Sequence, residues 1–134
     1  MSIAHFTCTS LPSGLDQFST WWLSIGFASA AYGDEDVLHV ALGVDDEDDA
    51  ASGCAGLYLE RTDQAQGGYG LTARIELTGE TLCVWLSSEG AEVLEFDAQC
   101  LCFTLDCPPD ELAAARKVLM EMQADGAPVV IVAA

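Results

Sequence analysis

Apolar and β-branched residues occur along most of the chain in short runs, which are separated by segments rich in glycine, proline and acidic residues. Runs of this kind, bounded by turn residues, predict the strands of a sheet. The predicted strands are Ile3–Thr9, Thr20–Ser29, Val37–Leu42, a strand that begins at Leu57, Tyr69–Leu77, Thr81–Leu86, Ala98–Leu105 and a last edge strand at Pro128–Val132. The short turns between neighbouring runs favour antiparallel pairing.

The clearest hairpin lies in the middle of the chain. Alternate residues of its first strand are apolar, which predicts one face turned toward a core: Leu71, Ala73, Ile75 and Leu77. Thr78, Gly79 and Glu80 then form a tight turn into Thr81–Leu86. Because both faces of Thr81–Leu86 are apolar, this strand is expected at the centre of the sheet.

A helix is predicted near the end of the chain. Pro108 and Pro109 are suited to its start, acidic residues occupy its first turn, and Gly126 is suited to its end. Apolar residues recur there at helical spacing, which predicts an amphipathic helix: Leu112, Ala115, Leu119 and Met122. A second, short helix is expected at Ser87–Leu94.

The chain has 134 residues, of which 51% are hydrophobic. This length is typical of one compact domain and is sufficient to bury a core without disulfides or a metal. We therefore expect residues 1–134 to form a single α+β domain, mainly an antiparallel β-sheet with one C-terminal amphipathic helix packed on it.

The net charge of the chain is unusual for a small domain. The chain has 22 Asp and Glu against four Lys and Arg, which gives a formal net charge of -18. Burying an unpaired ion is costly, so the carboxylates are expected at the surface. Such a surface repels nucleic acid phosphates and acidic membranes, and it attracts basic proteins, including those that normally bind DNA. Direct binding of nucleic acid or of a membrane is therefore not expected.

The first residues do not resemble a signal peptide, because MSIAHFTCTSLPSGLDQF has no Lys or Arg and no long apolar run. No segment reaches the ~18 apolar residues that a membrane span needs. We therefore expect a cytoplasmic protein, in which cysteines are reduced and behave as small apolar residues. The cysteines are Cys8, Cys54, Cys83, Cys100, Cys102 and Cys107.

Motifs for catalysis, cofactors and metals are incomplete. The cysteines have no Cys-x-x-Cys spacing for zinc, and the acidic segment has Ala50 and Gly56 where a calcium loop needs glycine and glutamate. The glycines of Gly68–Ala73 precede a predicted strand and not the helix that a dinucleotide requires. His39 lies in an apolar strand, as a core or interface histidine does. We expect no cofactor, no metal site and no enzymatic activity.

Acidic residues are concentrated between Asp34 and Asp49, where eight acidic residues occur with no Lys or Arg. Carboxylates this close repel one another, because the Debye length at physiological salt is ~8 Å. A cationic partner relieves that repulsion, and complementary charge accelerates association. An acidic segment that only maintains solubility is the simpler alternative, although it does not account for so one-sided an excess.

The run DEDDAASGCAGLYLERTDQAQGGYGLTARIELTGETLCVWL resembles the immunity proteins numbered ten of bacterial polymorphic toxin systems. The similar features, in order, are the acidic stretch, a small-residue segment, the strand Tyr58–Glu60, the turn at Asp63 and Gln64, the segment Gly67–Gly70 and the strand Arg74–Leu77. The resemblance covers about residues 35 to 105. It implies a small cytosolic protein that binds a toxin domain and blocks it.

Charge and resemblance together predict an inhibitor of a toxin with a basic surface, such as one directed at nucleic acid. The alternative is a DNA mimic that sequesters a DNA-binding protein through the same acids. The residues predicted to guide the encounter are Asp34, Glu35, Asp36, Asp45, Asp46, Glu47, Asp48 and Asp49, and the nearer contacts are Glu60, Asp63 and Tyr69.

Aromatic residues are the candidate anchors of affinity, because rim charges mostly change association rates. The candidates are Tyr58, Tyr69, Trp21 and Trp22. Each of them has a competing interpretation as a core residue, since aromatic rings in strands usually pack inside. The sequence leaves the oligomeric state open.

Overall fold

The computed structural model describes residues 3–17, 20–30, 32–42, 57–62 and 67–132. Its strands are β1 (Ile3–Ser10), β2 (Ser13–Leu15), β3 (Trp21–Ser29), β4 (Gly33–Leu42), β5 (Leu57–Arg61), β6 (Gly67–Tyr69), β7 (Thr72–Thr78), β8 (Thr81–Leu86), β9 (Cys100–Leu105) and β10 (Val129–Val132). Its helices are α2 (Ser88–Val93) and α3 (Pro109–Ala124). The α+β class predicted from the sequence is confirmed.

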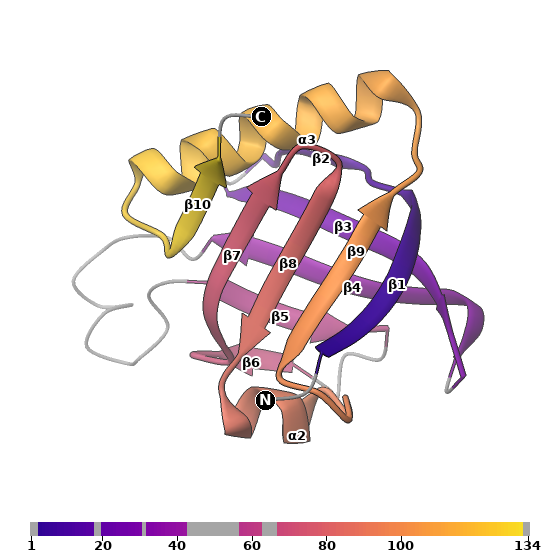
Figure 1. The fold of residues 1–134 in the computed structure, drawn as a ribbon. Coiled ribbons are helices and arrows are strands. Elements are labelled where there is room, and N and C mark those ends of the chain that lie inside the picture. The colour runs from indigo at the N-terminus through magenta and orange to yellow at the C-terminus, as the bar shows by residue number, and fades with distance from the viewer. Residues whose placement is uncertain (1–2, 18–19, 31, 43–56, 63–66, 133–134) are drawn as a thin grey trace.

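These strands form one sheet in the order β10-β7-β8-β9-β1-β3-β4-β5-β6, with β2 paired to β3. The pairs β1–β9 and β10–β7 are parallel, and the other pairs are antiparallel. The sheet curls, so that β7, β8 and β9 lie across β3, β4 and β5 (Figure 1). The mainly antiparallel pairing agrees with the sequence pattern, and β8 is an interior strand, third from one edge, between β7 and β9.

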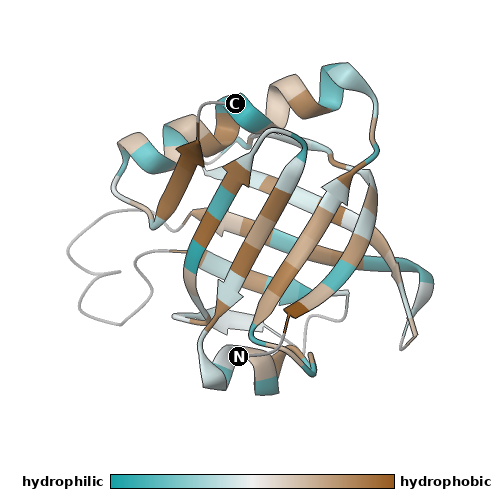
Figure 2. Ribbon diagram, in the orientation of Figure 1, coloured by the Kyte–Doolittle hydropathy of each residue, from teal (hydrophilic) through white to brown (hydrophobic). Residues whose placement is uncertain are grey.

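The core fills the inside of the curled sheet. Each strand turns alternate residues inward, and in β3 these are Leu23, Ile25 and Phe27, all nearly inaccessible to solvent. The rings of Phe6, Phe27, Phe96 and Phe103 pack together there, with centroids 4.7 to 6.3 Å apart. Figure 2 shows the resulting alternation of apolar and polar residues along β7.

The two helices lie at opposite ends of the curled sheet (Figure 1). α3 packs against β2, β3 and β10 and buries one stripe of apolar residues, namely Ala115, Val118, Leu119 and Met122. Gly126 follows it with a φ of 94°, a conformation that glycine adopts without strain. The short helix α2 packs against β8 at the other end, and the Ser87 side chain accepts a hydrogen bond from the Gly90 amide. Both predicted helices are confirmed.

Some strand boundaries differ from those expected. β2 forms between the first two predicted strands, where no strand was predicted, and β4 begins at Gly33 instead of Val37. Tyr69 belongs to β6, because Gly70 has a φ of 73° and turns the chain before β7 begins. Ala73 is exposed instead of facing the core, because the register shifts between Thr72 and Arg74. Local irregularities of this kind leave little trace in the hydrophobic pattern.

Close backbone packing at Gly90 provides a test of how α2 closes the end of the sheet. A Cβ atom at Gly90 would lie 2.0 Å from the Leu71 carbonyl oxygen. In most helices Gly→Ala is stabilising by up to about 1 kcal/mol. Here we expect Gly90→Ala to destabilise the protein by about 1–3 kcal/mol, because backbone must move to make room. Chemical denaturation measures the change.

The matched control is Gly68→Ala, since a Cβ atom there meets only the Leu71 side chain at 3.7 Å. Its free energy of unfolding should change much less. Equal losses in the two variants would show that the contact between α2 and Leu71 does not set the cost.

Candidate partner-binding face

Six side chains lie together on the outer surface of strands β3 to β6. We call this surface the aromatic face, and it consists of Trp22, Ser24, His39, Tyr58, Glu60 and Tyr69. They lie outside because Leu23, Ile25, Leu38, Val40 and Leu59, which alternate with them, point into the core. Strand pairing aligns them in two adjacent rows, one through Trp22, Ala41, Tyr58 and Tyr69, and the other through Ser24, His39 and Glu60.

His39 is held at the centre of the aromatic face. Its ring stacks on Trp22 with centroids 6.0 Å apart and an interplanar angle of 28°. Its Nδ1 atom lies 2.7 Å from the Ser24 hydroxyl oxygen, which is a hydrogen-bonding distance. These contacts fix the orientation of the imidazole and of the indole beside it.

The two tyrosines form the other half of this face. Their rings meet edge to face, with centroids 5.3 Å apart. The Tyr58 hydroxyl donates to Glu60 Oε1 at 2.7 Å, and this hydrogen bond, together with burial, raises the pKa of Tyr58 to about 12. A Cβ atom at Gly67 would lie 2.7 Å from that hydroxyl, so glycine leaves room for it beside β6. Tyr69 remains 38% exposed.

A shallow hollow lies on each side of His39, and both contain carboxylates. One has a volume of about 410 Å³ and is lined by Glu35, Val37, His39, Glu60 and Thr62. The other has a volume of about 310 Å³ and is lined by Asp16, Thr20, Trp22, His39 and Ala41. The aromatic face thus combines packed rings with negative charge at its borders.

The sequence predicted Asp36 at the surface, but the structure places it in the interior. It has no solvent exposure, because the alternation of β4 turns it inward on the same side as Leu38 and Val40. Arg61, which is 2% exposed, supplies the opposite charge, with its Nη2 atom 2.7 Å from Asp36 Oδ2. The expectation that Asp36 guides a partner is therefore wrong: it is half of an interior ion pair.

Hydroxyl groups, backbone carbonyls and aromatic rings surround this ion pair. Ser29 and Thr62 donate hydroxyl hydrogen bonds to the Asp36 carboxylate at 2.6 and 2.7 Å. Arg61 Nη1 donates to the carbonyl oxygens of Leu94 and Glu95 at 2.9 and 2.8 Å. The guanidinium also lies over the rings of Phe96 and Tyr32, at 3.8 and 4.8 Å from their centroids.

Opposing effects act on the Asp36 carboxyl group. Burial alone would raise its pKa, because burial disfavours the charged form. The hydrogen bonds from Arg61, Ser29 and Thr62, together with the Arg61 charge, outweigh burial and hold the pKa below its usual range. Asp36 is therefore ionised at neutral pH despite its burial.

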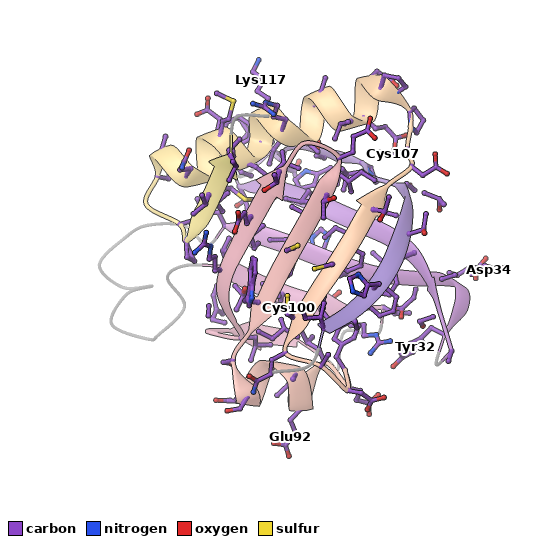
Figure 3. The ribbon with its side chains drawn as sticks, in the orientation of Figure 1. Tyr32, Asp34, Glu92, Cys100, Cys107 and Lys117 are labelled. Carbon is purple, nitrogen blue, oxygen red and sulfur yellow. The ribbon has the colours of Figure 1, made fainter. Side chains whose placement is uncertain are left out.

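Of the other predicted acids, Asp34, Glu35 and Glu60 lie within the described residues. Asp34 and Glu35 are exposed at the start of β4, where Figure 3 shows Asp34 projecting near the β3–β4 turn. Asp45, Asp46, Glu47, Asp48, Asp49 and Asp63 lie outside the described residues.

The aromatic candidates separate into two groups. Trp22, Tyr58 and Tyr69 lie on the aromatic face, and Glu60 joins them there. Trp21 packs against the core instead. Sequence reasoning missed the grouping around His39, although the alternation of Val37–Leu42 placed His39 opposite Leu38 and Val40. It also missed Arg61 as the partner of Asp36.

Within the described ranges, no three His, Cys, Asp or Glu side chains are grouped as a metal ion would require. None of the helices in those ranges has the length and apolar character to cross a membrane.

A rigid sheet that presents packed aromatic rings beside carboxylates is suited to binding another protein. The family model described as Immunity protein 10 matches residues 16–113, which is more than two thirds of the chain. The chain belongs to the Immunity protein 10 family, as its sequence resemblance implied. The matched region includes all of the aromatic face. No curated protein and no solved structure matches the chain significantly.

The interior ion pair gives a prediction for stability. Asp36→Asn leaves the Arg61 charge buried without a full counter-charge, so we expect a loss of about 3–5 kcal/mol at pH 7. The pKa of Asp36 is lower in the folded chain than in the unfolded chain. Its stabilising contribution is therefore complete above the unfolded value of about 3.9 and is lost as the pH falls through the folded value.

Urea unfolding of both proteins between pH 2.5 and 7 measures this contribution. The stability difference between wild type and Asp36→Asn should be constant near neutrality and shrink below about pH 4. Asp34→Asn is the control, because Asp34 is exposed on the same strand and its loss should change stability little. A difference that is independent of pH would show that the charge of Asp36 is not what stabilises the fold.

Proposed function

We propose that this immunity protein neutralises a toxin domain by laying its aromatic face on a basic surface of the toxin, such as the substrate cleft of a nucleic-acid-directed enzyme. Membership of the Immunity protein 10 family implies a toxin as the partner. The observation that supports the location is the aromatic face itself, with carboxylates in the hollows on both sides of His39. In this proposal the chain is a cytoplasmic inhibitor and not an enzyme.

The positions of the few basic residues support a cationic partner. The chain has only four of them, Arg61, Arg74, Arg116 and Lys117. Arg61 is buried, Arg74 pairs with Glu76 on β7 at 2.8 Å, and Arg116 and Lys117 are on α3. None of these four basic residues belongs to the aromatic face, whereas Glu60 does. The local potential is negative and favours Lys and Arg of a partner.

Charge alone does not supply the affinity that an inhibitor needs. A nanomolar dissociation constant corresponds to about 12 kcal/mol of binding free energy. Exposed ion pairs contribute a few tenths of a kcal/mol each, whereas buried aromatic anchors contribute about 2 kcal/mol or more. Trp22, Tyr58 and Tyr69 are large rings already held by their neighbours, so little side-chain freedom is lost when a partner covers them.

Co-expression with the protein encoded immediately upstream, as the candidate toxin, tests the proposal. We expect cells carrying both proteins to survive, and the two proteins to co-purify as a stable complex. Survival must depend on the aromatic face, so the Trp22→Ala, Tyr69→Ala double variant is expected to lose protection while remaining folded. Protection that persists in this folded double variant would place the toxin-binding surface elsewhere on the protein.

Binding kinetics separate the roles of rings and acids. Tyr69→Ala should raise the dissociation rate about 30-fold, corresponding to about 2 kcal/mol, with little change in association. Replacing the five acids from Asp45 to Asp49 with their amides should slow association and flatten its salt dependence, with dissociation nearly unchanged. Surface plasmon resonance at several salt concentrations distinguishes the two effects.

Met120→Ala is the matched control, because Met120 is 52% exposed and apolar but lies on α3. Its rates should equal those of the wild type. A faster dissociation after neutralising the acids, with unchanged association, contradicts the steering role.

A further inference from the structure

Three thiols lie together on one side of β8 and β9, away from the aromatic face: Cys83 and Cys102 are partly buried and Cys100 is buried. Cys83 and Cys102 are direct partners across the two antiparallel strands, and their sulfur atoms are 2.9 Å apart. Cys100 is two residues before Cys102 on β9, with its sulfur 3.8 Å from that of Cys102. Figure 3 labels Cys100 on this sheet. All three are free thiols.

Backbone hydrogen bonding shows which kind of cross-strand pair Cys83 and Cys102 form. The Leu105 amide donates to the Glu80 carbonyl, and the Leu86 amide donates to the Gln99 carbonyl. Hydrogen-bonded pairs alternate with non-hydrogen-bonded pairs along an antiparallel ladder. Glu80–Leu105 and Leu86–Gln99 are both hydrogen-bonded pairs, and Cys83–Cys102 is the third pair from each of them. The alternation therefore makes Cys83–Cys102 a non-hydrogen-bonded pair.

This type of pair favours a covalent link. Side chains are closest at non-hydrogen-bonded positions, where the Cα atoms are typically about 4.5 Å apart. That separation lies within the range of about 4.4–6.8 Å that a disulfide spans. Cys100 and Cys102 point the same way along one strand and are separated by two residue rises, about 6.7 Å. The cross-strand pair is therefore the better placed of the two.

We propose that Cys83 and Cys102 are a modification site, at which exchange with a small-molecule disulfide forms a reversible cross-strand disulfide. One cysteine thiolate attacks a sulfur of the reagent, forming a mixed disulfide and releasing one reagent thiolate. The second cysteine, as thiolate, attacks the protein-bound sulfur, forming the Cys83–Cys102 bond and releasing the other. The two protein thiols together lose two protons and two electrons, and the reagent disulfide is reduced to two thiols.

The surroundings of Cys83 and Cys100 slow their reaction with disulfides. Burial, together with the hydrogen bond to Cys102, raises the pKa of Cys83 to about 12, and burial raises that of Cys100 to about 11. Exchange requires a thiolate, so these thiols react slowly at neutral pH. The proximity of Cys83 and Cys102 nevertheless drives the second step, because closure of the bond is intramolecular.

The bond would act on the end of the sheet that contains α2. The segment between Cys83 and Cys102 includes α2 and the carbonyl groups of Leu94 and Glu95 that accept hydrogen bonds from Arg61. A disulfide here closes that segment into a loop and restricts the unfolded chain more than the folded one. Oxidation should therefore stabilise the fold without requiring any change at the aromatic face.

Oxidised glutathione applied to the purified, folded chain at pH 8.5 tests the proposal. Before blocking, we expect the oxidised chain to be lighter than the reduced chain by two hydrogen atoms. After the free thiols are blocked, Cys83 and Cys102 should carry no blocking group, and peptide mapping should identify a Cys83–Cys102 link. The melting temperature should rise by about 5–10 °C and return on reduction with dithiothreitol. Because mapping uses the unmutated chain, it does not depend on any variant folding.

Cys100→Ser is the matched control and should form the same link with the same thermal shift. Cys83→Ser and Cys102→Ser should form no such link and show no rise in melting temperature. The proposal is overturned if Cys83 or Cys102 of the wild type retains glutathione as a mixed disulfide, or if either of them links to a different cysteine. It is also overturned if Cys83 and Cys102 remain reduced while the protein is folded.

Discussion

The interior ion pair between Asp36 and Arg61 is the contact on which the rest of the structure depends. It joins β4 to β5, and through the carbonyls of Leu94 and Glu95 it also holds the segment that follows α2. A buried ion pair is tolerated only when its remaining hydrogen-bonding groups are satisfied, and here hydroxyls, carbonyls and aromatic rings all contribute. Thr62 and Glu95 have φ values of 49° and 58°, and both border this network, which holds them in a conformation that non-glycine residues seldom adopt.

The same ion pair links the interior to the aromatic face, because both are built on the alternation of one strand. When Asp36 points inward to Arg61, Glu35, Val37 and His39 must point outward. Pairing with β5 then places Glu60 beside His39 and Tyr58 beside Ala41. A slip of one residue in β4 would bury His39 and expose Leu38 and Val40. The buried Asp36–Arg61 pair therefore fixes the register of β4, and this register places the aromatic face on the outside.

Sequence patterns predicted most of the fold, because strands, hairpin and helices are encoded by residues close together in the chain. Leu112 to Met122 and Thr81 to Leu86 are clear examples, with helical spacing in the first and two apolar faces in the second. Asp36 was misjudged because its burial depends on Arg61, which is 25 residues away and comes next to it only through the pairing of β4 with β5. Trp22 and His39 likewise meet only across strands, so no local pattern could indicate their stacking. The family resemblance identified the type of partner but not the surface that meets it.

Stability and binding place opposite demands on the charges of this protein. Uncompensated carboxylates repel one another in the free molecule, so the core and the Asp36–Arg61 pair must hold the fold against that repulsion. Pairing more of the acids internally would stabilise the free protein, but it would also remove the field that attracts a basic partner. Using Arg61 inside and leaving the aromatic face without Lys or Arg resolves this conflict. In the proposed complex, a cationic surface relieves the repulsion, and the aromatic rings, already fixed by strand pairing, supply the short-range contacts that charge cannot.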